Sequence, residues 1–416
     1  MSKLKTILVS VVLIFAVSTS ALANGLSLNS VGARALGMGG AFVGLANDAT
    51  ALYWNPAGLA GQQSSVLVFA SDIIPMATYK MDLAGIDAKV NANHYISPNA
   101  FFNYNMGKLA LGLGVFVPAG LGADWNATDF GYPEGFEFSS KIAVINIAPG
   151  VAYQVTDQFS VGVALNVYYA MFDMFQPAVV PGAGVFQFEE SSTGIGFGAT
   201  LGLKYDINEM FSLGATFRTK TSVTMDGTAK NPAFGAFGAP ESEFERDVAW
   251  PTWIAGGIAI RPNDKLTIAL DGQYSMWSEN QELVAKYTNA VWNGAMTASG
   301  GDTFELKWED ALQVRVGLEY VVSETVMLRG GYYYDPAPSP DETVNVLFPS
   351  STNNVITGGL SYKMGQMCFT GAAEYLMGAE RDIPVLIENG ESVNAMPGVH
   401  QMDIFAFSLG FTYFLK

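Results

Sequence analysis

Apolar residues recur at every second position in segments of about ten residues along most of this chain. In KLALGLGVFVP, residues 108–118, the leucines and valines at the odd positions share one face. In ALQVRVGLEY, residues 311–320, the apolar side chains fall on one face, and Gln313, Arg315 and Glu319 fall on the other. Successive side chains of a strand point to opposite faces, so this alternation predicts β-strands with an apolar and a polar face. A polar face of this kind suits a water-filled lumen.

The connections between these segments alternate between short and long. Short turns lie near residues 105–108, 156–157, 206–209, 261–265, 323–324 and 364–366, and longer loops near residues 80–93, 122–136, 173–192, 226–245, 278–305, 335–352 and 378–399. Six turns and seven loops separate fourteen strands, the first of which starts near residue 64. An even number of strands with both chain ends on one side is typical of outer-membrane barrels, which have short periplasmic turns and long outer loops.

The start of the chain predicts export. Residues 1–23 combine two early lysines, an apolar run from Ile7 to Val17 and an A-x-A cleavage site at residues 21–23, as a secretory signal peptide does. After it, no run of about eighteen apolar residues follows, although hydrophobic residues make up 50% of the chain and charged residues only 14%. A closed barrel is the other structure that satisfies its backbone groups in lipid. We therefore expect an all-β, fourteen-stranded antiparallel transmembrane barrel of residues 64–416 in the bacterial outer membrane.

Five tryptophans lie near the ends of the expected strands. Tryptophan gathers in the aromatic girdles of membrane barrels, but it also packs into strands and protein cores. The sequence leaves both interpretations open for these residues: Trp125, Trp250, Trp253, Trp277 and Trp308.

Residues 24–63 lack the strand rhythm and are rich in glycine and alanine. They include NDATALYWNPAGLAG at residues 47–61, which is too broken for a strand and too short for a spanning helix. A barrel of fourteen strands is too wide for its own side chains to fill, since eight strands is near that limit. We therefore expect residues 24–63 to form a plug, or hatch, inside the lumen.

The stretch from residue 25 to residue 61 resembles the N-terminal hatch of the FadL-type outer-membrane transporters. That family's Asn-Pro-Ala triplet falls on Asn55, Pro56 and Ala57. Residues 251–278, ending in Trp-Ser, and residues 307–340, with a Pro-containing loop, are also similar to the family. The resemblance implies a gate at the triplet and a kinked third strand that opens the wall sideways.

The third expected strand, residues 108–121, suits such an opening. Pro118 cannot donate a ladder hydrogen bond, and Gly114 and Gly120 weaken the strand. The resemblance implies that Asn55 lies against this kink and satisfies backbone groups near Pro118. Two plainer interpretations stay open: Pro118 marks the outer end of an ordinary strand, and Asn-Pro-Ala is only a structural turn.

The resemblance implies passive uptake of hydrophobic compounds, either long-chain fatty acids or aromatic hydrocarbons. Exposed apolar clusters mark binding sites, and we predict an outer capture groove in residues 173–192 and 226–245, with the phenylalanines Phe175, Phe186, Phe188, Phe234 and Phe237. The family's carboxylate-binding basic residues have no match, because Met171 and Asp173 stand where one is expected. An uncharged cargo is therefore compatible with the sequence. The alternative function is a barrel of the same fold that serves as a secretion or surface-attachment component. A third, a general porin, is disfavoured by the plug.

Other chemistry finds little support. Neither His94 nor His400 has a recognisable serine partner motif, so we expect no enzyme activity, no metal and no cofactor. A net charge of −17 argues against a nucleic-acid partner. The expected partners are hydrophobic molecules, outer-membrane lipid and lipopolysaccharide, with the protein as a monomer.

Overall fold

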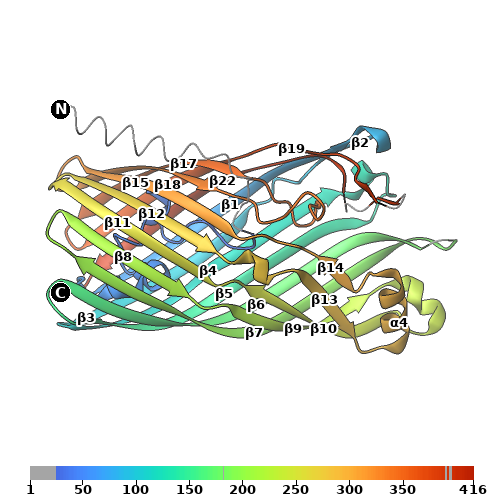
Figure 1. Ribbon diagram of the computed structural model, residues 1–416, viewed down its shortest axis with the longest axis horizontal. Coiled ribbons are helices and arrows are strands. Elements are labelled where there is room, and N and C mark those ends of the chain that lie inside the picture. The colour runs from blue at the N-terminus through green and yellow to red at the C-terminus, as the bar shows by residue number, and fades with distance from the viewer. Residues whose placement is uncertain (1–24, 181, 389–390, 393–395) are drawn as a thin grey trace.

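The alternating segments form the wall of a closed antiparallel barrel (Figure 1). This structure is a computed structural model that describes residues 25–180, 182–388, 391–392 and 396–416. The expected signal peptide, residues 1–23, and Asn24 lie outside the described residues. Within the described residues, no helix is long and apolar enough to cross a membrane.

Fourteen barrel strands are found in the described part of the chain, as predicted. The last of them, β22, pairs with the first, β1, from Ser65↔Phe414 to Lys80↔Val399, and this pairing closes the wall. Three of the fourteen are built from two pieces each. In chain order they are β1 (Ser65–Met81), β3 (Tyr95–Met106), β4 (Leu109–Asn126), β5 (Glu137–Gln154), β6 (Phe159–Val180), β7 (Gly184–Asp206), β8 (Phe211–Arg218) with β9 (Thr221–Lys230), β10 (Glu241–Trp250) with β11 (Trp253–Asn263), β12 (Leu266–Ser275) with β13 (Glu282–Tyr287), β15 (Ala311–Val321), β16 (Val326–Asp335), β17 (Asn353–Met364), β18 (Met367–Gly378) and β22 (Gly398–Phe414).

The three divided strands break side by side, around one small pocket. The breaks fall at residues 219–220, 251–252 and 276–281. Pro251 lies in the middle break and has no backbone N–H for the ladder. The breaks let the outer pieces of these strands, β9, β10 and β13, continue as a separate outer portion of the wall.

The two faces of the wall are those that the sequence predicts, but the lumen near the hatch is packed. On β15, Leu312 is 53% exposed on the outside, whereas Gln313 and Arg315 are 0% and 2% exposed. The expectation of a wet lumen at these positions is wrong. Residues 25–63 cover these side chains, which hydrogen-bond with Asn29 and Gly39 of that segment.

We call residues 25–63 the hatch. Figure 1 shows it in blue between the strands, toward the end of the barrel where the C-terminus lies. It contains α2 (Ala33–Gly37), α3 (Ala51–Trp54) and the 3-10 turn η1 (Pro56–Leu59). Asn55 caps η1, since its side-chain oxygen accepts from the Ala57 N–H at 3.2 Å, and Pro56 supplies the fixed φ that the first position of a helix favours. Trp54 is 1% exposed.

Glycines on the inner face of the wall let the hatch approach the strands backbone to backbone. A Cβ atom at any of five of them would overlap atoms of Met38, Gly39, Val43, Gly44 or Asn55. Larger side chains would hold the hatch away from the wall, so its backbone groups could not reach the wall's side chains. The five wall glycines are Gly202, Gly214, Gly257, Gly317 and Gly331.

The outer connections carry more regular structure than the sequence indicates. Residues 173–192 are not a loop, because β6 and β7 extend through them as one long hairpin with twenty-two register pairs, from Phe159↔Tyr205 to Val180↔Gly184. Residues 226–245 are mostly β9, η4 and β10, and only the segment between Lys230 and Glu241 connects strands. The remaining elements are β2 (Ile86–Lys89), β14 (Thr303–Glu305), β19 (Arg381–Ile383), β20 (Ile387–Glu388), β21 (Glu391–Ser392), α4 (Ala290–Ser299), η2 (Asp82–Ala84), η3 (Ala127–Phe130), η4 (Pro232–Phe237) and η5 (Trp277–Glu279).

Two adjacent glycines of β16 offer a matched test of hatch packing. Gly331→Val places a side chain into Met38 and Gly39 of the hatch, whereas a Cβ at Gly330, on the other face, meets only the Thr357 oxygen at 3.9 Å. We expect Gly331→Val to displace the hatch and to raise the ion conductance of the protein in planar bilayers severalfold. Gly330→Val should conduct like the parent. Equal conductance in folded samples of both variants would contradict this role of the wall glycines.

Candidate functional site: a break in the wall and the hatch behind it

The wall is broken between the second and third barrel strands. β3 and β4 pair from Met106↔Leu109 only as far as Ala100↔Val115. Beyond that point β4 remains paired with β5, with a register shift between Phe116 and Ala119. Pro118 lies within the shift, so the expected kink at this residue is present. The plainer interpretation, that Pro118 marks the end of an ordinary strand, does not hold, because β4 continues to Asn126.

Hydrogen bonds mark both ends of the break. At the end nearer the β3–β4 turn, the Val117 N–H donates to Asn99 Oδ1 at 2.9 Å. At the other end, the Asn91 N–H donates to the Asp124 carbonyl at 2.7 Å, and Val90 forms a bridge with Trp125. The unpaired stretch therefore lies between residues 95–99 of β3 and residues 117–123 of β4.

The first residues of the hatch complete the hydrogen bonds of the kink. The Leu28 N–H donates to the Pro118 carbonyl at 2.9 Å, and the Gly120 N–H donates to the Leu26 carbonyl at 3.1 Å. Ser27 thus forms an antiparallel bridge with Ala119. We call residues 26–28 the latch. Two hydrogen bonds from a short segment hold the latch against the wall, and neither requires a particular side chain.

The expected contact between Asn55 and the kink is wrong. The Asn55 amide donates to the carbonyls of Val43 and Leu203, at 3.1 and 2.9 Å, and its oxygen caps Ala57. The Asn-Pro turn therefore fastens the hatch to β7, where Gly202 leaves room for it. The backbone of the latch, and not the Asn55 side chain, therefore meets the kink.

A cavity of about 520 Å³ runs through the break. Its lining includes residues of the lumen side, such as Asn29, Asp335 and Glu374, which are buried or partly buried. It also includes Ile96 and Val115 on the outer face, which are 70% and 41% exposed. Lumen and outer surface thus share one cavity at this position.

Of the three residues expected to line a lateral opening, Pro118 and Gly120 lie at the break in the wall. Pro118 forms the kink, and Gly120 lines the cavity, where an added Cβ would meet only the Ile142 carbonyl oxygen at 3.5 Å. Gly114 lies outside the break. It pairs regularly with Phe101 of β3 and Ala148 of β5, and the rings of Phe101 and Phe116 cover it.

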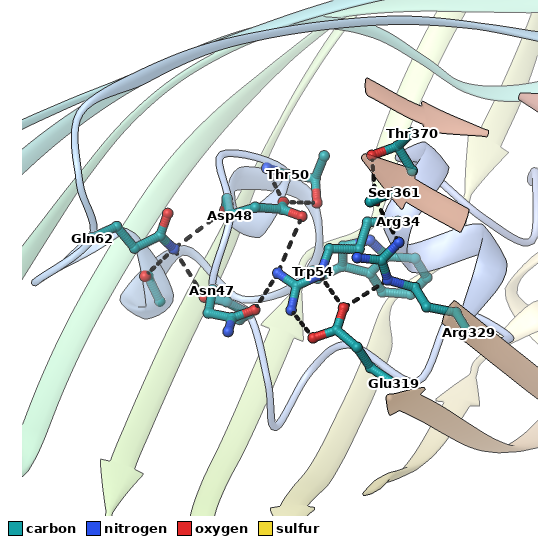
Figure 2. Close-up of polar contacts among 12 residues, drawn as sticks. Arg34, Asn47, Asp48, Thr50, Trp54, Gln62, Glu319, Arg329, Ser361 and Thr370 are labelled. Atoms are coloured by element: carbon teal, nitrogen blue, oxygen red, sulfur yellow. Dashed lines mark hydrogen bonds and ion pairs between the residues drawn. The ribbon is translucent and has the colours of Figure 1, made fainter. Parts of the chain in front are cut away.

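Charged groups fasten the hatch to the opposite wall (Figure 2). Arg34 of the hatch donates twice to Glu319 of β15, each time at 2.8 Å, and Arg329 of β16 donates to the same carboxylate at 2.6 Å. Arg329 also donates to Ser361 at 2.6 Å. Burial by itself would lower the pKa of Arg34, but the carboxylates of Glu319 and Asp48 raise the pKa above its ordinary value. Arg34 therefore stays charged.

Other wall side chains bind the hatch backbone directly. Asp271 accepts from the N–H groups of Val43 and Gly44, at 2.6 and 3.4 Å. Arg315 donates to the carbonyls of Asn29 and Gly39, at 3.0 and 3.1 Å. Sequence reasoning missed these roles. The signal was present, since charged residues at inward positions of strands need partners, but the partner segment was not known.

Buried aromatic side chains fill much of the outer half of the lumen, around the Arg246–Glu190 ion pair. We call these residues the outer aromatic cluster; its buried members include Tyr168, Phe172, Phe188, Trp250, Trp277, Tyr287, Trp292, Trp308 and Phe348. The five tryptophans considered for a girdle are all buried, with exposed fractions of 6% or less, so the core interpretation is the correct one. The segment after β16 folds inward beneath them, and the Trp125 indole donates to the Val346 carbonyl at 2.9 Å.

The five phenylalanines proposed for capture are divided among different places. Phe188 and Phe234 pack around Trp292, with ring centroids 6.2 and 4.6 Å from it. Phe237 ends η4 and is 72% exposed. Phe175 and Phe186 lie partly exposed on the β6–β7 hairpin. Only the first two belong to one cluster, so a single groove formed by all five is not what the structure contains.

The two histidines have structural partners. His94 Nδ1 lies 2.6 Å from the Asp72 carboxylate, and His400 Nε2 lies 2.9 Å from the Met396 carbonyl. No group of three or more metal-ligating side chains is found among the described residues.

The chain matches, over residues 14–413, the family described as outer membrane protein transport protein (OMPP1/FadL/TodX). It belongs to this family. The protein is therefore an outer-membrane transport protein of the FadL and TodX type. The identification agrees with the resemblance that the hatch sequence showed.

Two solved structures share the fold across nearly the whole chain. A FadL homologue of Pseudomonas aeruginosa has a TM-score of 0.78 at 17% identity, covering 94% of this chain and 100% of that one. The toluene transporter TodX of Pseudomonas putida has a TM-score of 0.73 at 16% identity, covering 95% and 100%. Outer membrane protein P1 of Haemophilus influenzae is 24% identical over 300 residues, which are 64% of this chain and 62% of that protein.

Removing Glu319 and removing Arg34 should loosen the hatch to different extents. Glu319→Gln leaves the buried Arg329 and the partly buried Arg34 without the Glu319 carboxylate, and removing one partner of a buried ion pair costs about 3–5 kcal/mol. Arg34→Met removes one cation and leaves Glu319 paired with Arg329. We expect chymotrypsin to cleave folded Glu319→Gln protein at Tyr53 or Trp54 faster than Arg34→Met protein, with the parent slowest. The reverse order, read by mass spectrometry, would contradict this account of hatch anchoring.

Proposed function

We propose that this transport protein takes up hydrophobic compounds from outside the cell and releases them sideways into the outer membrane through the break between β3 and β4. The observation that carries the proposal is the cavity that lumen and outer-face residues line together. The outer aromatic cluster provides the first apolar environment, and the latch separates it from the exit.

The energetics require no nucleotide and no ion gradient. Each CH₂ group that moves from water into hydrocarbon gains about 0.8 kcal/mol, so a cargo molecule that reaches the bilayer does not return readily. We take long-chain fatty acids and aromatic hydrocarbons as the cargo classes, since the relatives include a long-chain fatty acid transport protein of Escherichia coli and the toluene transporter TodX.

The latch suits a gate better than the Asn-Pro-Ala turn does. Residues 26–28 form two backbone hydrogen bonds with the kink, and each contributes about 1 kcal/mol net to stability. Asn55, by contrast, is fully buried and holds three hydrogen bonds within the hatch and to β7. We propose that the latch moves while the triplet stays in place.

Uptake by cells tests the function directly. Cells that carry the gene should take up labelled oleate, toluene or both faster than cells without it, while planar-bilayer recordings should show no large steady current. Equal uptake by both strains would sink the proposal. A large steady conductance of the parent protein would indicate an open porin.

Filling the exit is the sharpest test of the route. Gly120→Val adds a side chain that projects into the cavity with only one neighbouring atom within 4 Å of its Cβ, so the barrel should fold normally. We expect uptake to fall severalfold. Gly330→Val, which adds the same atoms on the outer face of β16, is the matched control and should transport like the parent. If Gly120→Val protein is folded and transports normally, cargo does not leave through this break.

Capture at the outer end has its own test. Phe237 is exposed, whereas Phe188 supports the packing of Trp292. We expect Phe237→Ser to weaken uptake at low cargo concentration without changing barrel assembly, because it removes apolar contact area from the outer surface. The measure is the initial uptake rate at several cargo concentrations. A rate equal to the parent's at the lowest concentration would exclude Phe237 from capture.

A further inference from the structure

The cavity that runs through the wall break, which we call the exit cavity, has a polar end on its lumen side. Asp335, Asn353 and Glu374 line this end from the neighbouring strands β16, β17 and β18, and Ser350 lines it from the segment between β16 and β17. Toward the outer face the lining changes to isoleucine and valine side chains, such as Ile96. The exit cavity therefore offers polar atoms at one end and apolar contact at the other.

Glu374 has acceptor positions left at this polar end. It is buried, and the Tyr333 hydroxyl donates to its Oε2 atom at 3.0 Å. The Ser30 hydroxyl of the hatch lies beside it. A carboxylate has two oxygens with about four positions for donors, so these two neighbours do not fill its capacity. Glu374 can therefore accept a hydrogen bond from a molecule in the exit cavity.

Asp335 contributes a second carboxylate to the same end, although its hydrogen bonds are made within the protein. Its oxygens accept from the amide groups of Asn29, Gln313 and Asn353. All three donors are neutral side chains, so they hold the carboxylate in place without neutralising its charge. Asp335 therefore adds to the negative potential at the lumen end of the exit cavity.

Neither carboxylate has a charged partner. In the described part of the chain, no Lys, Arg or His nitrogen lies within 4.0 Å of Asp335 or Glu374. Arg315 extends into this part of the lumen, but its hydrogen bonds go to the hatch backbone and to Gln313. The Glu319 carboxylate, by contrast, pairs with two arginines. Buried carboxylates are ordinarily paired because their removal from water is costly.

Two further atoms of the polar end lack a partner. Asn353 Oδ1 and Ser350 Oγ are buried and have no hydrogen-bond partner among the residues that the structure describes. The two residues are 2% and 9% exposed, and both line the exit cavity. The Asn353 amide nitrogen already donates to Asp335 and to the Ser351 carbonyl, so its free atom is an acceptor. Unpaired buried polar atoms are costly, and a ligand that donates hydrogen bonds satisfies them.

We propose that the lumen end of the exit cavity binds a hydrogen-bond-donating head group, a hydroxyl or an ammonium, of an otherwise apolar cargo, with Glu374 as the principal acceptor. The apolar part of the cargo lies along the isoleucines and valines that lead to the outer face. An ionised carboxylate is disfavoured here, because it can only accept hydrogen bonds and would face two carboxylates. The inference rests on the proposed function and assigns it a substrate class: long-chain or aromatic alcohols and amines.

The basic residues of the exit cavity do not change this selectivity. Lys141 and His94, the two in its lining, are both exposed. Lys141 lies opposite Asp173 in the register of β5 and β6, and His94 lies 2.6 Å from Asp72. Met171 and Asp173, where the family resemblance implies a basic residue, also line this cavity. Its lumen end therefore presents acceptors without a cation.

Calorimetric titration of the purified full-length protein in a nonionic detergent tests the proposal. The probes are decylamine, decanol and decanoate, which share one saturated chain, and each affinity is compared between the parent and Glu374→Gln. Partitioning of the probe into detergent is the same for both proteins and cancels. We expect Glu374→Gln to lower the affinity for decylamine at least about tenfold, since hydrogen bonds between charged groups are the strong ones. The affinity for decanol should fall by a smaller factor, and that for decanoate should rise.

Opposite changes for probes with the same chain cannot come from a general loosening of the barrel. Glu245→Gln is the matched control, because Glu245 is exposed on β10 outside the lining and the substitution removes the same charge. It should bind all three probes like the parent. Folded Glu374→Gln protein with parental affinities for decylamine and decanol would overturn the proposal. If Glu374→Gln does not fold, Ser350→Ala decides: it should weaken decanol binding severalfold, and unchanged binding would count against the site.

The proposed function can fail separately. Toluene has no hydrogen-bond donor, so its uptake by cells does not depend on the Glu374 carboxylate. Toluene uptake that Gly120→Val reduces, together with unchanged probe affinities in Glu374→Gln, would refute the donor site and leave the transport function in place. If parent cells take up neither toluene, oleate nor decanol faster than cells without the gene, the transport function is refuted, whatever the purified protein binds.

Discussion

Every backbone N–H and C=O group in the wall must find a partner inside the protein, because the hydrocarbon of the membrane offers none. Pairing of β1 with β22 meets this requirement around the ring. At the kink of β4 the ladder to β3 is lost, and Leu26 and Leu28 bond to Gly120 and Pro118 instead. The latch therefore stabilises the break in the wall by completing two of its hydrogen bonds from the lumen side. Hatch and opening form one unit for this physical reason.

The position of the hatch depends on wall glycines, which have no side chain, and on wall side chains that bind the hatch backbone. Glycines such as Gly257 and Gly331 bring the two backbones together, and side chains such as Asp271 and Arg315 then reach the hatch backbone from the wall. Glu319 pairs with Arg34 of the hatch and with Arg329 of the wall. A buried network of this kind is stable only when all its members are present, which favours one hatch position over many.

The lumen has two chemically different halves. Charged and amide side chains surround the hatch, whereas aromatic rings predominate in the outer half, around the single Arg246–Glu190 pair found there among the described residues. The boundary between the two halves falls at the strand breaks, where Arg218, Trp250 and Trp277 line one small pocket.

The sequence by itself determined the barrel, its fourteen strands and the faces of residues such as Leu312 and Gln313, because a period of two is a local property of the chain. The loss of that period before residue 64 also indicated that the preceding residues are not strands of the wall. Only the tertiary structure decided that the latch and not Asn55 meets Pro118, and that the five tryptophans are buried in the lumen. These facts depend on which distant segments become neighbours when the sheet closes, and alternation along one strand contains no information about that.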